Sequence, residues 1–192
     1  MSRRHVLPPS ASSLAASMRD LGYSLETAVA DLVDNSISAR ATQVDIVCDL
    51  EHDSPSLAVI DNGSGMSTDE LLIAMRHGAG HPGDARRPDD LGRFGLGLKT
   101  ASFSQCRRLT VLTLKDGALS GAEWDLDLID REDEWALLVL EPEEAAGQPV
   151  AQKLAGHGTA VIWRNLDRLF EDERGDRRHE IVNEKLDALE NH

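Results

Sequence analysis

The spacing of apolar residues along the chain changes between the period of a helix and that of a strand. A repeat of three to four residues predicts helices over 12–20, 24–38 and 68–76. Shorter alternating or fully apolar runs predict strands over 42–48, 56–61, 109–114, 118–126, 135–140 and 159–163. Because the two kinds of element are interspersed, we expect an α/β sandwich whose sheet is at least partly antiparallel.

Capping and turn residues mark the ends of several elements. Ser24 and Ser67 stand where N-caps are expected, before the second and third helices. The pair Asp116-Gly117 predicts a hairpin turn between two strands. A fourth helix is expected over 96–106, and residues 141–157 are expected to form an irregular connection.

The chain divides into three parts by composition. Residues 1–11 are basic and rich in Pro and Ser, which is typical of a flexible arm, and 12–170 hold the predicted elements. Residues 171–192 are charged with helical spacing, and we expect them to begin a following region. Within the domain, residues 77–95 hold five glycines and two prolines. A loop of this length inside a compact domain is usually functional.

Charge and composition restrict the partners of the chain. Its 192 residues carry 34 acidic and 20 basic side chains, for a net charge of −14. Duplex binding depends on cationic groups that neutralise phosphates, so nucleic acid is expected to be bound only through regions outside this chain. No apolar run is long enough to span a bilayer and no secretory signal is visible, so we expect a cytoplasmic protein without a membrane segment.

One face of the helix over 24–38 collects short polar side chains, namely Thr27, Asp31, Asp34, Asn35 and Ser38. Asp31 and Asn35 are four residues apart and therefore neighbours on the helix surface. A solvated face is the ordinary interpretation, but exposed faces favour long side chains and Asn is a poor helix former. A carboxylate beside a carboxamide oxygen could instead hold a divalent cation or position a water.

Two glycine-rich turns are the next candidates. Asp61 ends a buried strand and leads into Asn-Gly-Ser-Gly-Met66, where glycines 63 and 65 would allow a planar ligand to approach the backbone. An ordinary Asp/Gly turn is the alternative. Gly92-Arg-Phe-Gly-Leu-Gly97 leads into a helix, whose free N–H groups can bind an anion, and Lys99 adds a cation.

The sequence lacks the residue patterns of several other common functional sites. The P-loop sequence is absent, and no strand leads directly into the glycine-rich segment as it does in a Rossmann turn. No histidine pairs with a second His or Cys at the spacing of a zinc site, and the motif G-x-S-x-G of serine hydrolases is missing. Cys48 and Cys106 are too few for a metal cluster or a disulfide framework.

Four segments in this order resemble the ATP-binding superfamily that joins DNA gyrase, the ninety-kilodalton heat-shock chaperones, histidine kinases and MutL. They are Ala30–Ala39, Asp61–Met66, Gly92–Thr100 and Gly158-Thr159. The strings D-N-S-I-S-A and G-R-F-G-L-G-L-K look closest to its MORC-like and MutL-like branches. The resemblance covers residues 14–165 and implies a Bergerat-type fold, a two-layer α/β sandwich with a mixed, mostly antiparallel sheet that binds ATP beneath its helices.

The resemblance also implies roles for individual residues. Asn35 would bind Mg²⁺, Asp61 would accept the adenine amino group beside Thr159, and the segment over 77–97 would close over the triphosphate. The nucleotide-binding set implied in this way is Asp34, Asn35, Asp61, Gly63, Gly65, Met66, Gly92, Phe94, Gly95, Leu96, Gly97, Lys99 and Thr159.

Asp31 departs from the family pattern. Hydrolysing relatives carry Glu at this place, four residues before the Asn, where it activates water. Asp is one methylene shorter, about 1.5 Å, and general-base catalysis depends on hydrogen-bond reach. With Asp31 as the catalytic residue, the sequence favours Mg²⁺-dependent ATP binding and slow hydrolysis by the N-terminal ATPase domain of a larger protein.

Three alternatives stay open at this stage. The first is a domain that holds ATP without hydrolysing it and acts as a switch or an ATP-dependent homodimerisation module. A histidine kinase domain is less favoured, because no pair of helices with a phosphoacceptor histidine precedes it. The last is a structural α/β domain in which the glycines occur by chance.

Overall fold

The computed structural model describes residues 8–21, 23–50, 55–76 and 97–170, together with His5, Arg177, Glu180, Ile181, Glu184 and Asp187. The loop predicted over 77–95 therefore lies outside the described residues, as does most of the arm over 1–11. The proposed domain boundaries stay predictions. Within the described part of the chain, every helix is too short or too polar to cross a lipid bilayer.

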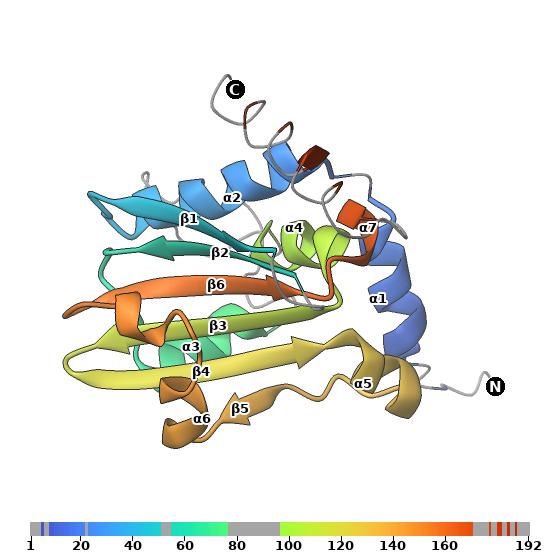
Figure 1. Cartoon of the computed structure of the whole chain (residues 1–192). Coiled ribbons are helices and arrows are strands. Elements are labelled where there is room, and N and C mark those ends of the chain that lie inside the picture. The colour runs from blue at the N-terminus through green and yellow to red at the C-terminus, as the bar shows by residue number, and fades with distance from the viewer. Residues whose placement is uncertain are drawn as a thin grey trace.

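Six strands form one sheet in the order β1-β2-β6-β3-β4-β5 (Figure 1). The strands are β1 (Val44–Asp49), β2 (Ser56–Asp61), β3 (Arg108–Lys115), β4 (Ala118–Asp125), β5 (Leu138–Leu140) and β6 (Gly158–Arg164). The helices are α1 (Ala11–Arg19), α2 (Leu25–Ser38), α3 (Thr68–Met75), α4 (Gly97–Gln105), α5 (Leu126–Glu132), α6 (Pro142–Ala146), the 3-10 turn η1 (Ala151–Lys153) and α7 (Asp167–Phe170). All five pairings of these strands are antiparallel, and the predicted sandwich with a mostly antiparallel sheet is confirmed.

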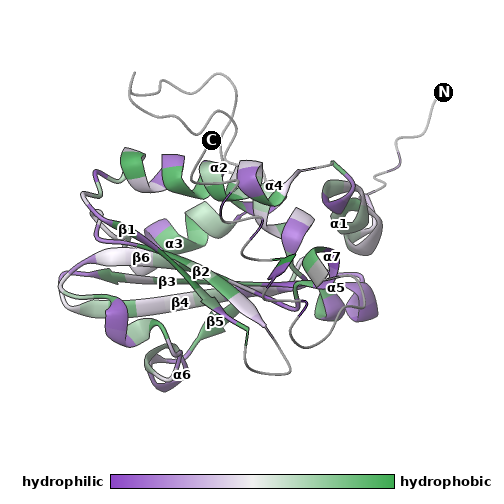
Figure 2. Ribbon diagram, turned by 45° about the horizontal axis from the view of Figure 1, so that its top comes forward, coloured by the Kyte–Doolittle hydropathy of each residue, from purple (hydrophilic) through white to green (hydrophobic). Residues whose placement is uncertain are grey.

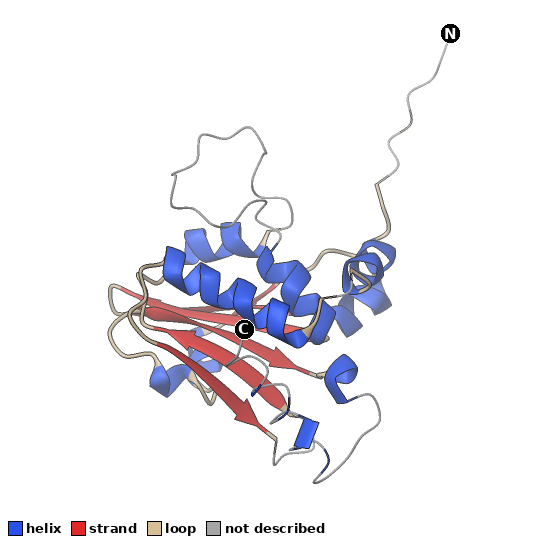
Figure 3. Ribbon diagram, turned by 90° about the horizontal axis from the view of Figure 1, so that it is seen from above, coloured by secondary structure: helices blue, strands red, loops and turns tan. Residues whose placement is uncertain are grey.

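The sheet buries both of its faces. Seen from above, α2 and α4 lie across one face (Figure 3). Side chains alternate along each strand, so Leu57, Val111 and Trp163 pack under these helices. Ile60 and Ile162 point to the opposite face, in a smaller core with residues of α6 and of the segment around η1. Hydrophobic residues are accordingly concentrated in the central strands (Figure 2).

The longest helix, α2, begins where its capping residue predicts. The hydroxyl of Ser24 accepts a hydrogen bond from the backbone N–H of Thr27, which satisfies one of the free donors of the first turn. Val29 and Leu32 are almost fully buried on the inner face of α2. Burial of each such side chain stabilises the fold by about 2 kcal/mol, so this face fixes how α2 is rotated above the sheet.

The hairpin and the third helix also follow the prediction. Asp116 and Gly117 have positive φ angles of 52° and 78°, as a two-residue turn between β3 and β4 requires. Ser67 caps α3 in a capping box with Glu70, and Glu70 also forms an ion pair with Lys115 of β3. These contacts hold α3 against the end of the hairpin.

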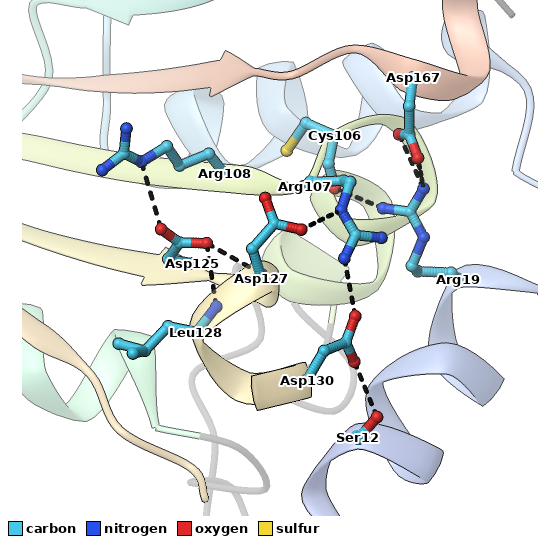
Figure 4. A network of polar contacts seen from close by, with 10 residues as sticks. All are labelled: Ser12, Arg19, Cys106, Arg107, Arg108, Asp125, Asp127, Leu128, Asp130 and Asp167. Carbon is cyan, nitrogen blue, oxygen red and sulfur yellow. Dashed lines mark hydrogen bonds and ion pairs between the residues drawn. The ribbon is translucent and has the colours of Figure 1, made fainter. Parts of the chain in front are cut away.

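Three parts of the expected pattern are wrong. Leu126 was expected to end a strand, but it begins α5, because the side chain of Asp125 accepts hydrogen bonds from the N–H groups of Asp127 and Leu128 (Figure 4). The strand expected over 135–140 is shorter, and only β5 pairs with β4. The connection over 141–157 contains α6 and η1. The signal for α6 was present, since Glu141 forms a capping box with Glu144 and Pro142 occupies the first turn.

Candidate functional site

The carboxylate of Asp61 is held in one orientation beneath α2. Asp61 is the last residue of β2 and is 9% exposed. One carboxylate oxygen accepts a hydrogen bond from the backbone N–H of Gly63 at 2.8 Å, and the other accepts one from the hydroxyl of Ser36 at 3.1 Å. Each oxygen can accept a further hydrogen bond. Asp61 is therefore a fixed acceptor, and sequence reasoning missed the contribution of Ser36.

Asp61 lies in a row with two threonines on neighbouring strands. It is paired with Thr159 of β6, which is paired in turn with Thr113 of β3. In-register residues share a face of the sheet, so all three side chains point to the helical face. Asp61 and Thr159, which the resemblance implies for one site, are thus brought together.

Thr113 fixes the segment that follows Asp61. Its hydroxyl accepts a hydrogen bond from the backbone N–H of Met66 at 2.7 Å and lies 3.2 Å from the carbonyl oxygen of Gly158. Thr113 is fully buried. Sequence reasoning missed this residue, because only the pairing of β3 with β6 brings it to the site.

The glycines of this region allow close packing of backbone against backbone. A Cβ on Gly65, whose φ is +62°, would lie 2.3 Å from the carbonyl oxygen of Leu114. One on Gly158, with φ +140°, would lie 2.0 Å from the carbonyl oxygen of Asp61. The ring of His157 also bonds the carbonyl oxygen of Gly63 through Nδ1 at 2.6 Å. These contacts explain the glycines by packing, and direct contact of Gly63, Gly65 and Met66 with a ligand stays a prediction.

The polar face of α2 lies at the other side of the site. Asp34 and Asn35 are exposed, and Asp31 is half-buried. The pKa of Asp31 is raised, since burial raises it and the charge of Asp34 adds to this, while a hydrogen bond from Tyr23 acts in the opposite direction. A Cβ on Gly97 would lie 3.8 Å from a carboxylate oxygen of Asp31, so α4 begins beside this side chain.

The start of α4 presents backbone donors and one buried cation. The N–H groups of its first turn lack intrahelical acceptors, which makes the helix end attractive to anions. Lys99 is 1% exposed, and its ammonium donates a hydrogen bond to the carbonyl oxygen of Ala74 in α3 at 2.7 Å. Burial lowers the pKa of Lys99 to about 8. A contact of Lys99 with phosphate stays a prediction.

The remaining predicted ligands, Gly92, Phe94, Gly95 and Leu96, lie outside the described residues. The described part of the site combines a fixed acceptor at Asp61, a carboxylate and a carboxamide on α2, and the amide groups of α4. No ion pair joins Asp31, Asp34 or Asp61 to a basic side chain among the described residues.

Comparison with known proteins identifies relatives of this chain. The sequence pattern of the family described as histidine kinase-, DNA gyrase B- and HSP90-like ATPase matches residues 23–159. The DNA mismatch repair protein MutL of Opitutus terrae is 36% identical over 98 residues, 50% of this chain and 15% of MutL. ATPase morc-1 of Caenorhabditis elegans is 35% identical over 95 residues, 49% of this chain and 11% of the relative. The chaperone protein HtpG of Salinispora tropica is 30% identical over 113 residues, 50% of this chain and 17% of HtpG. The matched segments thus cover less than a fifth of these relatives.

Proposed function

Because the chain belongs to the histidine kinase-, DNA gyrase B- and HSP90-like ATPase family, we propose that it binds ATP with Mg²⁺ and hydrolyses it slowly as one domain of a larger, ATP-switched protein. The observation that carries this proposal is the fixed carboxylate of Asp61, which faces the helices in register with Thr159. A buried acceptor with both oxygens already oriented suits recognition of one amino group on a planar base.

Asp61 would accept a hydrogen bond from the exocyclic amino group of adenine, with Thr159 and a water beside it. Gly63, Gly65 and Met66 would form one wall of the base pocket. Thr113 supports this assignment, because its hydrogen bond to the N–H of Met66 fixes the wall before any ligand binds. The base would therefore enter a site that needs little rearrangement.

Asn35 would supply the protein ligand of Mg²⁺. Among the described residues, no three His, Cys, Asp or Glu side chains form a group that could hold a metal on its own. Mg²⁺ characteristically binds with few protein ligands and completes its shell with phosphate oxygens and waters. When bound, it would neutralise phosphate charge near the acidic face of α2. The amide groups at the start of α4 would bind the same phosphates, with Lys99 in the same turn.

Asp31 would act as the general base. Its carboxylate would take a proton from a water whose oxygen attacks the γ-phosphorus, and the bond to the β–γ bridging oxygen would break to give ADP and phosphate. The side chain is one methylene shorter than Glu, and its pKa is raised. The raised pKa makes the carboxylate a stronger base, but the shorter side chain reduces its reach to the water, so the proposed hydrolysis is slow.

The short side chain of Asp31 favours a second candidate, a domain that holds ATP as a long-lived switch. In this case bound ATP would stabilise a conformation or a homodimer instead of being consumed. Any contact with nucleic acid would belong to regions outside this chain, since its net charge is −14.

A single-turnover assay with γ-labelled ATP and Mg²⁺ separates these candidates. The wild type is compared with Asn35→Ala and Asp31→Asn, and the label is followed as bound ATP, free phosphate or phosphoprotein. Phosphate release by the wild type alone supports hydrolysis. Bound ATP that stays intact for hours supports the switch, and a rate gain in Asp31→Glu would then say that the native side chain is too short. Labelled protein would indicate a kinase and contradict both.

A further inference from the structure

His157 stands between two glycines and contacts the segment that follows Asp61. The flanking glycines have φ angles of +82° and +140°, which other residues rarely adopt. The antiparallel register pairs Asp61 of β2 with Thr159 of β6 (Figure 1). His157 precedes Thr159 by two residues and therefore comes opposite Gly63, whose carbonyl oxygen lies 2.6 Å from Nδ1 of the ring. A carbonyl oxygen only accepts, so Nδ1 carries the proton and donates it to this bond.

The contact restrains the peptide group that joins Gly63 to Ser64. His157 holds the carbonyl oxygen of this group, and its N–H donates to the carbonyl oxygen of Ala39, the C-cap of α2, at 2.9 Å. Gly63 is buried, and its own N–H donates to the carboxylate of Asp61 at 2.8 Å. Glycine is the most permissive residue of a backbone, so contacts on both sides must fix the direction of this N–H.

We propose that His157 is a positioning residue that sets the base specificity of the site, because it holds the backbone of Gly63 against the carboxylate of Asp61. The inference rests on the proposed function, in which Asp61 accepts a hydrogen bond from the amino group of adenine. Hypoxanthine carries a carbonyl oxygen at that place, and a carboxylate held in one orientation cannot pair with it. A site built to bind an amino group rejects an analogue that lacks one, provided that the acceptor cannot turn away.

Calorimetric titration of the full chain with ATP and with ITP, both with Mg²⁺, tests this specificity. ITP carries hypoxanthine in place of adenine. His157→Phe keeps an aromatic ring at an exposed position and removes the donor, whereas His157→Asn is the matched control that keeps a donor near the place of Nδ1. We expect His157→Phe to bind ATP about tenfold more weakly, the effect of one lost hydrogen bond, with ITP binding unchanged. His157→Asn should keep the wild-type preference for ATP.

The ratio of the two affinities separates this role from a structural one. A residue that only stabilised the loop would weaken the binding of both nucleotides alike. A wild-type ratio in His157→Phe, or a ratio in His157→Asn as low as that in His157→Phe, would overturn the proposal. A folded wild type that binds neither nucleotide would instead contradict the proposed function, and this inference with it.

NMR of ¹⁵N-histidine-labelled protein tests the contact without a nucleotide. The chain has seven histidines, and the signals that disappear in His157→Asn identify the ring of His157. We expect the neutral ring to carry its proton on Nδ1, because the hydrogen bond to Gly63 selects this tautomer, whereas free histidine prefers the proton on Nε2. A neutral ring of His157 with its proton on Nε2 would overturn the contact and the proposal.

Discussion

Two polar regions of the molecule contain similar side chains but differ in how their charges are balanced. In one region, the acids Asp127, Asp130 and Asp167 each pair with an arginine, either Arg19 of α1 or Arg107, the residue before β3. At the proposed nucleotide site, Asp61 has one hydroxyl and one amide donor, and no ion pair among the described residues joins Asp31 or Asp61 to a basic side chain. We call the first the closed network and the second the open site.

The closed network joins α1, α5 and α7 through the connection between α4 and β3 (Figure 4). Arg107 binds Asp127 of α5 and Asp130 at 2.7 Å each, and Asp130 also accepts a hydrogen bond from the hydroxyl of Ser12 in α1. Arg19 bridges the carbonyl oxygen of Cys106 and the carboxylate of Asp167 in α7. A cavity of about 140 Å³ between these elements is lined by Arg19, Arg107 and Asp130 of this network, together with another ion pair and apolar side chains of α1 and α5. This arrangement satisfies its own charges and needs no ligand.

The comparison shows that charge balance, more than residue type, separates a stabilising region from a ligand-binding one. Acids with paired cations stabilise a local arrangement, whereas acids that are oriented by neutral donors keep accepting capacity for a ligand. If this difference is real, substitutions in the open site should change ATP binding, and substitutions in the closed network should change stability alone.

The largest effect is expected from Asp61→Ala. It removes the fixed acceptor, and a charge-assisted hydrogen bond contributes up to about 3 kcal/mol, so ATP affinity should fall about 100-fold. Calorimetric titration with Mg²⁺ and ATP measures this loss, and a thermal melt confirms the fold. ATP binding of wild-type strength in the variant would remove Asp61 from the site.

Lys99 lies in the first turn of α4, beside the open site, and the ionisation of its buried ammonium can be tested by pH. Its pKa is lowered to about 8 by burial, so the folded protein releases this proton more easily than the unfolded chain does. The unfolded state therefore binds more protons between pH 8 and about 10.5, and stability should rise across this window by at most about 3 kcal/mol. Urea unfolding of the wild type and of Lys99→Met measures the difference. If the stability difference between the two proteins did not change with pH, Lys99 would be charged and paired in the folded protein.

Two threonines on opposite faces of β3 give a matched pair. Thr113→Val leaves the N–H of Met66 without its acceptor and should cost about 2 kcal/mol of stability together with a loss of ATP affinity. Thr110→Val, on the other face, loses a hydrogen bond to Glu123 and should lower stability similarly but leave ATP binding unchanged. Equal effects of both substitutions on ATP binding would contradict the assignment of the site to the helical face.

The smallest effect is expected in the closed network. Arg107→Met removes two partly exposed ion pairs and should cost no more than about 1 kcal/mol, with ATP binding unchanged. The pKa of Asp130 is lowered, first by Ser12 and also by Arg107. Its stabilisation is therefore present at neutral pH and is lost as the pH falls through the lowered value. The stability difference between the variant and the wild type should shrink in acid. A change in the ATP affinity of Arg107→Met would contradict the separation of the closed network from ATP binding.

The sequence predicted the elements that have strong periodicity and local caps. The helix that carries Asp31 and Asn35, the strand that ends at Asp61 and the hairpin at Gly117 all follow from spacing and turn chemistry. The short helix α5 was missed, because seven residues give little periodicity and its start depends on the cap by Asp125. Helix packing brings Ser36 to the site and strand pairing brings Thr113 there, so no local pattern marks them.

The most direct test of the central claim is a calorimetric titration of the folded protein with ATP, in Mg²⁺ and again in EDTA. We predict saturable binding that requires Mg²⁺ and is lost in Asn35→Ala, because Asn35 would bind the cation that neutralises the phosphates. Arg107→Met serves as the control from the closed network and should bind like the wild type. Absence of binding, or binding of equal strength in EDTA, would contradict the account.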